Sequence, residues 1–162
     1  MAKYPDPPGF AEWEAQVSGS LREDPLWRTP AYRFAVWLSD LARIDMGSLW
    51  RNPETVDIAD QLSRAVRGIS SNLAEGYGRT TGPERARYYD YAASSTREAR
   101  DWYFKARHYL PEDVVEQRFE LLLRILRILS AVIPRERADS IGRARRTRSR
   151  HRDSQTRTGD ET

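Results

Sequence analysis

The sequence contains no cysteine, which excludes disulfide bonds and thiolate metal sites. It also lacks any run approaching the ~20 consecutive apolar residues of a membrane-spanning helix. The first ten residues, MAKYPDPPGF, lack the apolar centre of a secretion signal. No segment alternates between apolar and polar residues with the period of two that marks a half-buried strand. We therefore expect an all-α, soluble, cytoplasmic protein with no membrane partner.

Lysine is nearly absent as well, since Lys3 and Lys105 are the only two lysines among 27 basic residues. The remaining 25 (27 − 2) are arginines, and the formal net charge is +3. Arginine binds phosphate through its bidentate guanidinium group, which would suit a nucleic-acid partner. A genome-wide codon bias would enrich arginine equally well. Composition alone therefore leaves nucleic-acid binding open.

Proline marks the start of four apolar repeats, at Pro30, Pro53, Pro83 and Pro111. Proline is favoured in the first turn of a helix, where its missing N–H has no intrahelical partner. The sequence therefore predicts helices from about 30, from 53 to 75, from 83 to 109 and from 111 to about 133. The joins between them are short, which favours antiparallel neighbours. The prediction is an antiparallel up-and-down four-helix bundle over residues 29–134.

Two flanking segments differ in composition from this bundle. Residues 1–28 are interrupted by prolines and glycines, and predict a partly ordered N-terminal extension that includes a short helix. Residues 135–162 are rich in arginine, serine and threonine and have few large apolar side chains. Such a segment cannot bury enough apolar surface to offset its ordering entropy, so we expect a disordered arginine-rich tail.

The fourth predicted helix carries two adjacent apolar stripes, more than one face of an isolated bundle needs. The second stripe consists of Val114, Leu121, Ile125, Ile128 and Val132. Large apolar patches mark interfaces, so these residues are predicted to form an oligomer interface. The alternative is that the N-terminal segment, with Trp13 and Trp27, folds back over the stripe.

A polar network is predicted between the second and third helices. Its members are Arg64, Asn72, Glu75, Ser95 and Glu98. Glu98 falls between Tyr91 and Trp102 on one helix face, a setting in which a carboxylate needs a cation, and we expect Arg64 to supply it. Asn72 and Glu75 lie three residues apart on a face that the small residues Ala65 and Gly68 open to close helix approach. A ligand pocket at this end of the bundle is the functional alternative.

No catalytic, cofactor-binding or metal-binding residues are predicted. His108 and His151 lack the Glu-x-x-His partners of di-iron bundles. The glycines at 76, 78 and 82 lack the strand and the Gly-Lys-Ser/Thr ending of a phosphate-binding loop. We therefore expect a protein that is not an enzyme and uses no cofactor.

Nucleic-acid contacts are predicted for two sets of arginines. The first lies in the tail and the second on the third helix: Arg143, Arg145, Arg146, Arg148, Arg150 and Arg152, with Arg85 and Arg87. Flexible arginines neutralise phosphates without reading sequence. A solvated tail is the alternative, and so is a protein–protein interaction scaffold without any nucleic-acid role.

The segment NLAEGYGR at 72–79, preceded by Arg64-Ala65 and followed by Tyr91-Ala92, Ser95 and Glu98, resembles a known signature. It is similar to the NIAEG-type motif of the four-helix-bundle family called 23S rRNA-intervening sequence proteins, over about 29–133. Ser94 and Ala99 stand where that family usually has glycine and leucine. The resemblance implies a homopentamer. Through the related accessory proteins of diversity-generating retroelements, it also implies RNA or DNA and a reverse transcriptase or another protein as partners.

Overall fold

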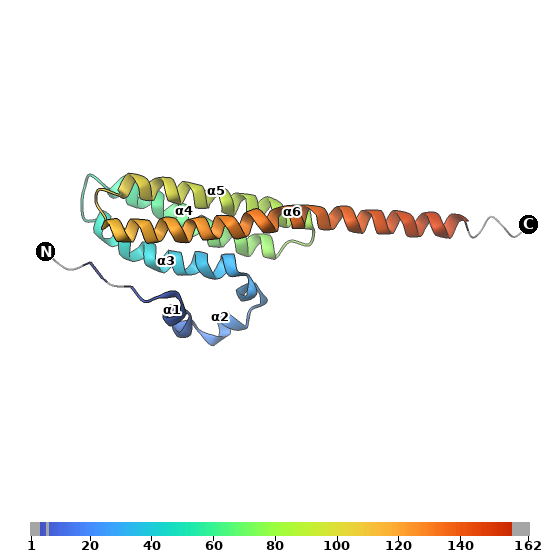
Figure 1. Cartoon of the computed structure of the whole chain (residues 1–162), viewed down its shortest axis with the longest axis horizontal. Coiled ribbons are helices and arrows are strands. Elements are labelled where there is room, and N and C mark those ends of the chain that lie inside the picture. The colour runs from blue at the N-terminus through green and yellow to red at the C-terminus, as the bar shows by residue number, and fades with distance from the viewer. Residues whose placement is uncertain (1–3, 6, 157–162) are drawn as a thin grey trace, which may run out of the picture.

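The computed structural model describes residues 4, 5 and 7–156, and their regular elements are all helices. Three short ones come first: α1 (Phe10–Gln16), α2 (Gly19–Glu23) and the 3-10 helix η1 (Pro25–Arg28). Four long ones follow: α3 (Pro30–Leu49), α4 (Val56–Tyr77), α5 (Gly82–Ala106) and α6 (Glu112–Thr156). Figure 1 shows the long helices lying alongside one another, with α1 and α2 beside α3. The prediction of an all-α protein is confirmed for the described residues.

Local signals explain where three of the long helices start. Thr29 is the N-cap residue of α3, and Pro30 is its first residue, as predicted. Thr81 caps α5, because its side chain accepts a hydrogen bond from the Glu84 N–H at 3.4 Å. Glu112 opens α6 directly after Pro111, and its carboxylate favours the positive end of the helix.

The predicted start of the second helix at Pro53 is wrong, because α4 begins only at Val56. Residues 50–55 form a turn instead. The Asn52 side chain accepts a hydrogen bond from the Glu54 N–H at 3.0 Å, an arrangement typical of turns. The buried Thr55 hydroxyl donates to the Leu49 carbonyl at 2.7 Å, which ties this turn to the end of α3. The third helix also ends earlier than predicted, at Ala106, with a turn following it.

The core lies between the four long helices. α4 packs extensively against α5, α5 against α6 and α3 against α4, whereas α3 and α6 contact each other less. Apolar side chains that recur every three or four residues fill this space. Fully buried examples from three of the helices are Leu38, Leu62, Ile69, Leu122 and Leu129.

The N-terminal segment packs on α3 through aromatic side chains. Trp13 and Trp27 are buried, and their rings stack at 6.0 Å. The Phe10 ring lies 4.8 Å from that of Phe34 on α3. The Trp13 indole N–H donates to the Asp40 carboxylate at 2.7 Å. The segment therefore folds back, as one of our alternatives required, but it covers α3 and not the second stripe of α6.

The last helix continues past the predicted boundary at residue 134. α6 includes Pro134 and runs to Thr156, whereas the sequence predicted a disordered tail over 135–162. Proline removes one intrahelical hydrogen bond. Ion pairs to α5 hold the next turns in place: Arg85 Nε lies 2.7 Å from Glu136 Oε2, and Arg137 pairs with Asp90. Residues 157–162 lie outside the described part of the chain.

Candidate functional site

The glycines of the NLAEGYGR segment act through packing and not through special backbone conformations. Gly76 is buried inside α4, and a Cβ atom there would lie 2.8 Å from the Tyr89 ring and 2.9 Å from Tyr88 Cβ. Gly78 follows the helix with ordinary helical angles. No described glycine has a positive φ. Glycine often ends a helix, but Gly76 lies inside α4, where its missing side chain allows α4 and α5 to approach closely.

Charged and aromatic groups complete the contact between the end of α4 and α5. Glu75 pairs with Arg79, whose guanidinium donates to the Tyr88 hydroxyl at 2.8 Å. The same guanidinium lies 4.6 Å from the centre of the Tyr88 ring. Glu75 is exposed. This arrangement closes the α4–α5 connection.

The predicted polar network is only partly assembled. Asn72 Nδ2 donates to the Gly68 carbonyl at 2.8 Å, and Ser95 of α5 lies against the same glycine. Arg64 and Glu98 are both exposed. Arg64 Nε instead donates to the Asp60 carbonyl of its own helix at 3.4 Å, and no ion pair joins it to Glu98 in the described chain. The structure therefore brings Asn72 and Ser95 together but leaves Glu98 in solvent, where it needs no buried cation.

The second apolar stripe of α6 is largely covered within the chain. Val114, Leu121 and Ile125 are buried, and Ile128 and Val132 are half-buried against the core. A groove of about 310 Å³ remains between α3 and α6, lined by Trp37, Leu41, Gln117, Arg118, Glu120, Leu121 and Arg124. A second copy is therefore not required to cover this stripe, because three of its five side chains are already buried within the chain.

An ion pair that the sequence analysis missed is buried between α3 and α6. Asp45 of α3 and Arg118 of α6 are 0% and 1% exposed. The guanidinium binds the carboxylate in bidentate fashion, with Nε–Oδ2 at 2.8 Å and Nη2–Oδ1 at 3.0 Å. The Tyr103 hydroxyl of α5 donates to Asp45 Oδ2 at 2.7 Å, and the Tyr4 hydroxyl donates to Oδ1. We call these four residues the Asp45 cluster.

The Asp45 cluster shifts the titration of its members. Burial, followed by the negative charge and hydrogen bond of Asp45, raises the pKa of Tyr103 well above its ordinary value. Burial and Asp45 likewise raise the pKa of Tyr4. Burial alone would lower the pKa of Arg118, but the hydrogen bond and charge of Asp45 raise it above its ordinary value. Both tyrosines therefore remain neutral donors, and Arg118 remains charged, at neutral pH.

The Asp45 cluster joins the N-terminal segment, α3, α5 and α6 at one point. Its carboxylate accepts four hydrogen bonds, two from Arg118 and one from each tyrosine. A buried charge satisfied in this way fixes the relative positions of the elements that carry it. We therefore assign the cluster a structural role.

A signal for the Asp45 cluster was present in the sequence. Asp45 continues the apolar repeat of Leu38, Leu41 and Leu49, and Arg118 falls between Val115 and Leu122 at helical spacing. A charge on the buried stripe of each of two helices indicates a buried pair.

Cations and aromatic rings are paired along α5. The Lys105 ammonium lies 3.9 Å from the centre of the Trp102 ring, and the Arg107 guanidinium lies 3.9 Å from that of Phe104. Arg87 donates to the Tyr91 hydroxyl at 2.8 Å. The surface of this helix thus combines positive charge with accessible π-faces, the two features that single-stranded nucleic acids bind.

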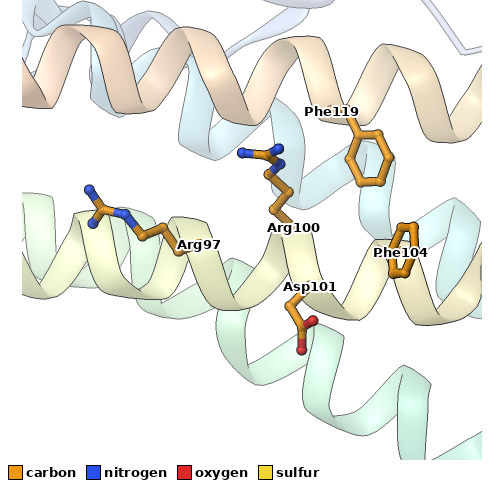
Figure 2. A pocket seen from close by; sticks show the side chains of 5 residues that line it. All are labelled: Arg97, Arg100, Asp101, Phe104 and Phe119. Carbon is orange, nitrogen blue, oxygen red and sulfur yellow. The ribbon is translucent and has the colours of Figure 1, made fainter.

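A groove opens between α5 and α6 on this side of the molecule. It has a volume of about 460 Å³ and is lined by Arg97, Arg100, Asp101, Phe104 and Phe119. Figure 2 shows Arg100 extending from α5 toward α6, Phe119 reaching down from α6, and Asp101 pointing the other way. We call it the α5–α6 groove.

The arginines predicted to contact nucleic acid have different environments. Arg85 is engaged by Glu136 and also donates to the carbonyls of Arg79 and Thr80, both at 3.2 Å. Arg87 is exposed. The predicted arginines of the tail lie on the helical backbone of α6, but their side chains lie outside the part of the chain described in that detail: Arg143, Arg145, Arg146, Arg148, Arg150 and Arg152. Arg85 is therefore less accessible to phosphate than Arg87, the other candidate on α5.

The described residues contain neither a metal-binding cluster nor a helix suited to span a membrane. Within the described residues, no three histidine, cysteine, aspartate or glutamate side chains gather in a way that could hold a metal ion. None of the described helices is long and apolar enough to cross a membrane.

Comparison with known proteins identifies the family of this chain. The family model described as 23S rRNA-intervening sequence protein matches residues 41–131, which is more than half of the chain. No curated protein matches the sequence. The matched range includes Asp45, Tyr103 and Arg118, whereas Tyr4 and the N-terminal aromatic residues lie outside it. The chain belongs to the 23S rRNA-intervening sequence protein family.

Proposed function

We propose that this protein is a non-enzymatic, nucleic-acid-binding accessory protein of the cytoplasm, built as an antiparallel up-and-down four-helix bundle. The packing of each long helix on the next, and of α3 on α6, supports that topology. So do the short connections at 50–55, 78–81 and 107–111. The satisfied Asp45 cluster supports a structural rather than catalytic use of the buried charges.

The arginine-rich end of α6 carries the proposal of nucleic-acid binding. In Figure 1 this helix projects well beyond the other three. The 22 residues after Pro134 (156 − 134) extend about 33 Å at 1.5 Å per residue. Six arginines fall between positions 143 and 152. A projecting helix with this density of positive charge suits the neutralisation of successive phosphates.

Salt dependence of binding tests the proposal. Fluorescence anisotropy of a labelled RNA would be measured with the full-length protein over a range of salt concentrations. If all six arginines contact phosphates, the plot of log K against log salt has a slope of about −4 to −5. Replacing these six arginines with glutamine should make the slope shallower by about 4 to 5.

The matched control replaces Arg64 and Arg67 with glutamine. Both are exposed on α4, away from the α6 extension, so their loss should leave the slope nearly unchanged. If the intact protein binds neither RNA nor DNA at low salt, the proposal is refuted. A protein-interaction scaffold would then be favoured, and the exposed aromatic side chains of Trp50 and Tyr77 are suited to partner contact.

We also propose that the protein forms a homo-oligomer, a pentamer by family resemblance. The α3–α6 groove and the half-buried Ile128 and Val132 support this, because they leave part of the predicted interface accessible. Light scattering with and without RNA measures the mass directly. A particle of 18.8 kDa at working concentration, the mass of one chain, would refute self-association. A reverse transcriptase is the protein partner that the resemblance proposes.

A further inference from the structure

We propose that the α5–α6 groove binds an unstacked base of a single-stranded nucleic acid, with the flanking phosphates held by Arg97 and Arg100. This inference rests on the proposed nucleic-acid function. It specifies that the nucleic acid is single-stranded and names the residues that bind it. It concerns a surface separate from the α6 extension, so the two can be tested independently.

The two arginines of the groove are available for phosphate. Neither Arg97 nor Arg100 makes a hydrogen bond or ion pair with another described residue, and both are exposed. Asp101, the acidic side chain at the groove, is already paired with Lys105 at 2.5 Å. In Figure 2 this aspartate points away from α6, whereas Arg100 extends toward it. The groove therefore presents positive charge to an entering anion.

The two phenylalanines supply faces for a base. Phe104 of α5 is 51% exposed, although it is a large apolar side chain, and Phe119 of α6 is half-buried beside it. The Arg107 guanidinium lies 3.9 Å from the centre of the Phe104 ring, so it restrains that ring and adds a positive charge near it. Aromatic rings stack on every base because each base has a π-face, and this contact is tolerant of sequence.

The combination of arginines and phenylalanine rings in the groove favours a single strand over a duplex. In a duplex the base faces are stacked on one another, whereas single-stranded loops and ends can turn a base outward onto a protein ring. The groove volume of about 460 Å³ falls in the range of pockets that hold small organic ligands. The groove is therefore large enough to receive a base, with arginines beside it for the phosphates.

The test compares single-stranded and duplex RNA on the full-length protein. Anisotropy would be measured with a fluorescein-labelled uridine-rich oligonucleotide and with the same strand annealed to its complement. Phe104→Leu should weaken single-strand binding about tenfold, the loss of one stacked base, and leave duplex binding unchanged. Replacing Arg97 and Arg100 with glutamine should make the single-strand salt slope shallower by about 1.4.

Controls separate the groove from the rest of the surface and from folding. The variant with Arg64→Gln and Arg67→Gln removes the same number of charges from α4 and should bind single strands like the intact protein. Thermal melting of each variant shows whether it is folded, and since Phe104 is half exposed, its replacement should leave the melting temperature nearly unchanged.

Three outcomes would overturn the inference. If the groove variants bind single strands normally while glutamines in the α6 extension abolish binding, the groove assignment is wrong and the proposed function stands. If uridine monophosphate competes as well as the oligonucleotide, the groove is a nucleotide site and not a strand site. If the intact protein binds no nucleic acid, both the function and the groove assignment fail.

Discussion

Replacing Asp45 with asparagine should be one of the most damaging single changes in this protein. The substitution preserves the size of the side chain but leaves the Arg118 guanidinium, 1% exposed, without its counter-charge. Removing one partner of a buried ion pair costs about 3–5 kcal/mol. Domains are stable by about 5–15 kcal/mol in total, so this loss is a large fraction. For a chain of this length, it should lower Tm by about 6–20 °C.

Equilibrium urea unfolding, followed by far-ultraviolet circular dichroism at neutral pH and fixed protein concentration, measures the loss. Asp101→Asn is the matched control, because it breaks an exposed pair with Lys105 and should cost at most about 0.5 kcal/mol. Adding Arg118→Met to Asp45→Asn should recover most of the stability, since the uncompensated charge is then gone. A loss below about 1 kcal/mol for Asp45→Asn would refute the reasoning, since it would mean that the arginine finds water or another partner.

Three further predictions concern other contacts. Tyr103 has a raised pKa in the folded protein, so the folded chain holds the phenol proton more tightly than the unfolded chain does. The contribution of neutral Tyr103 to the free energy of unfolding is therefore complete below about pH 10 and declines as the pH rises further. Urea unfolding between neutral pH and pH 11 should show this decline, and Tyr103→Phe should make it shallower; an equal slope in both proteins would contradict the assignment. Gly76→Ala should cost about 1–3 kcal/mol, because its Cβ would overlap the Tyr89 ring and Tyr88 Cβ of α5. Gly78→Ala, with helical angles and no atom within 3.6 Å, should be neutral or stabilising in the same melting assay, and equal effects would count against the packing argument. Arg85→Ala should speed amide hydrogen exchange at 135–139, since it removes the ion pair that holds this turn to α5; unchanged exchange there would show that the pair does not stabilise it.

The fold class was predictable because it depends on periodicity and chain breaks. Apolar repeats at helical spacing located all four long helices, and Pro30, Pro83 and Pro111 located three starts to within one residue. Proline did not mark a helix start at Pro53, where the hydrogen bonds of Asn52 and Thr55 stabilise a turn instead. After Pro134 the composition predicted disorder, whereas α6 continues through this proline, and ion pairs join the following residues to α5.

The candidate sites were less predictable because a stripe of residues on one helix does not identify its partner. The second stripe of α6 was correctly predicted to be apolar, yet the sequence could not show that most of it is buried within the chain. Glu98 was placed in an apolar setting because Tyr91 and Trp102 flank it, but Tyr91 and Glu98 both face solvent. The α5–α6 groove combines side chains from two helices, so neither helix alone indicated it.

The Asp45–Arg118 pair also has a kinetic consequence. Most helix contacts here join neighbours in sequence and can form by local hairpin closure, whereas this pair joins residues 73 positions apart. Its bonds form only when the first and last long helices meet, after the intervening loop has been closed. Weakening the pair should therefore increase the unfolding rate far more than it decreases the folding rate, so the pair slows unfolding of the native state.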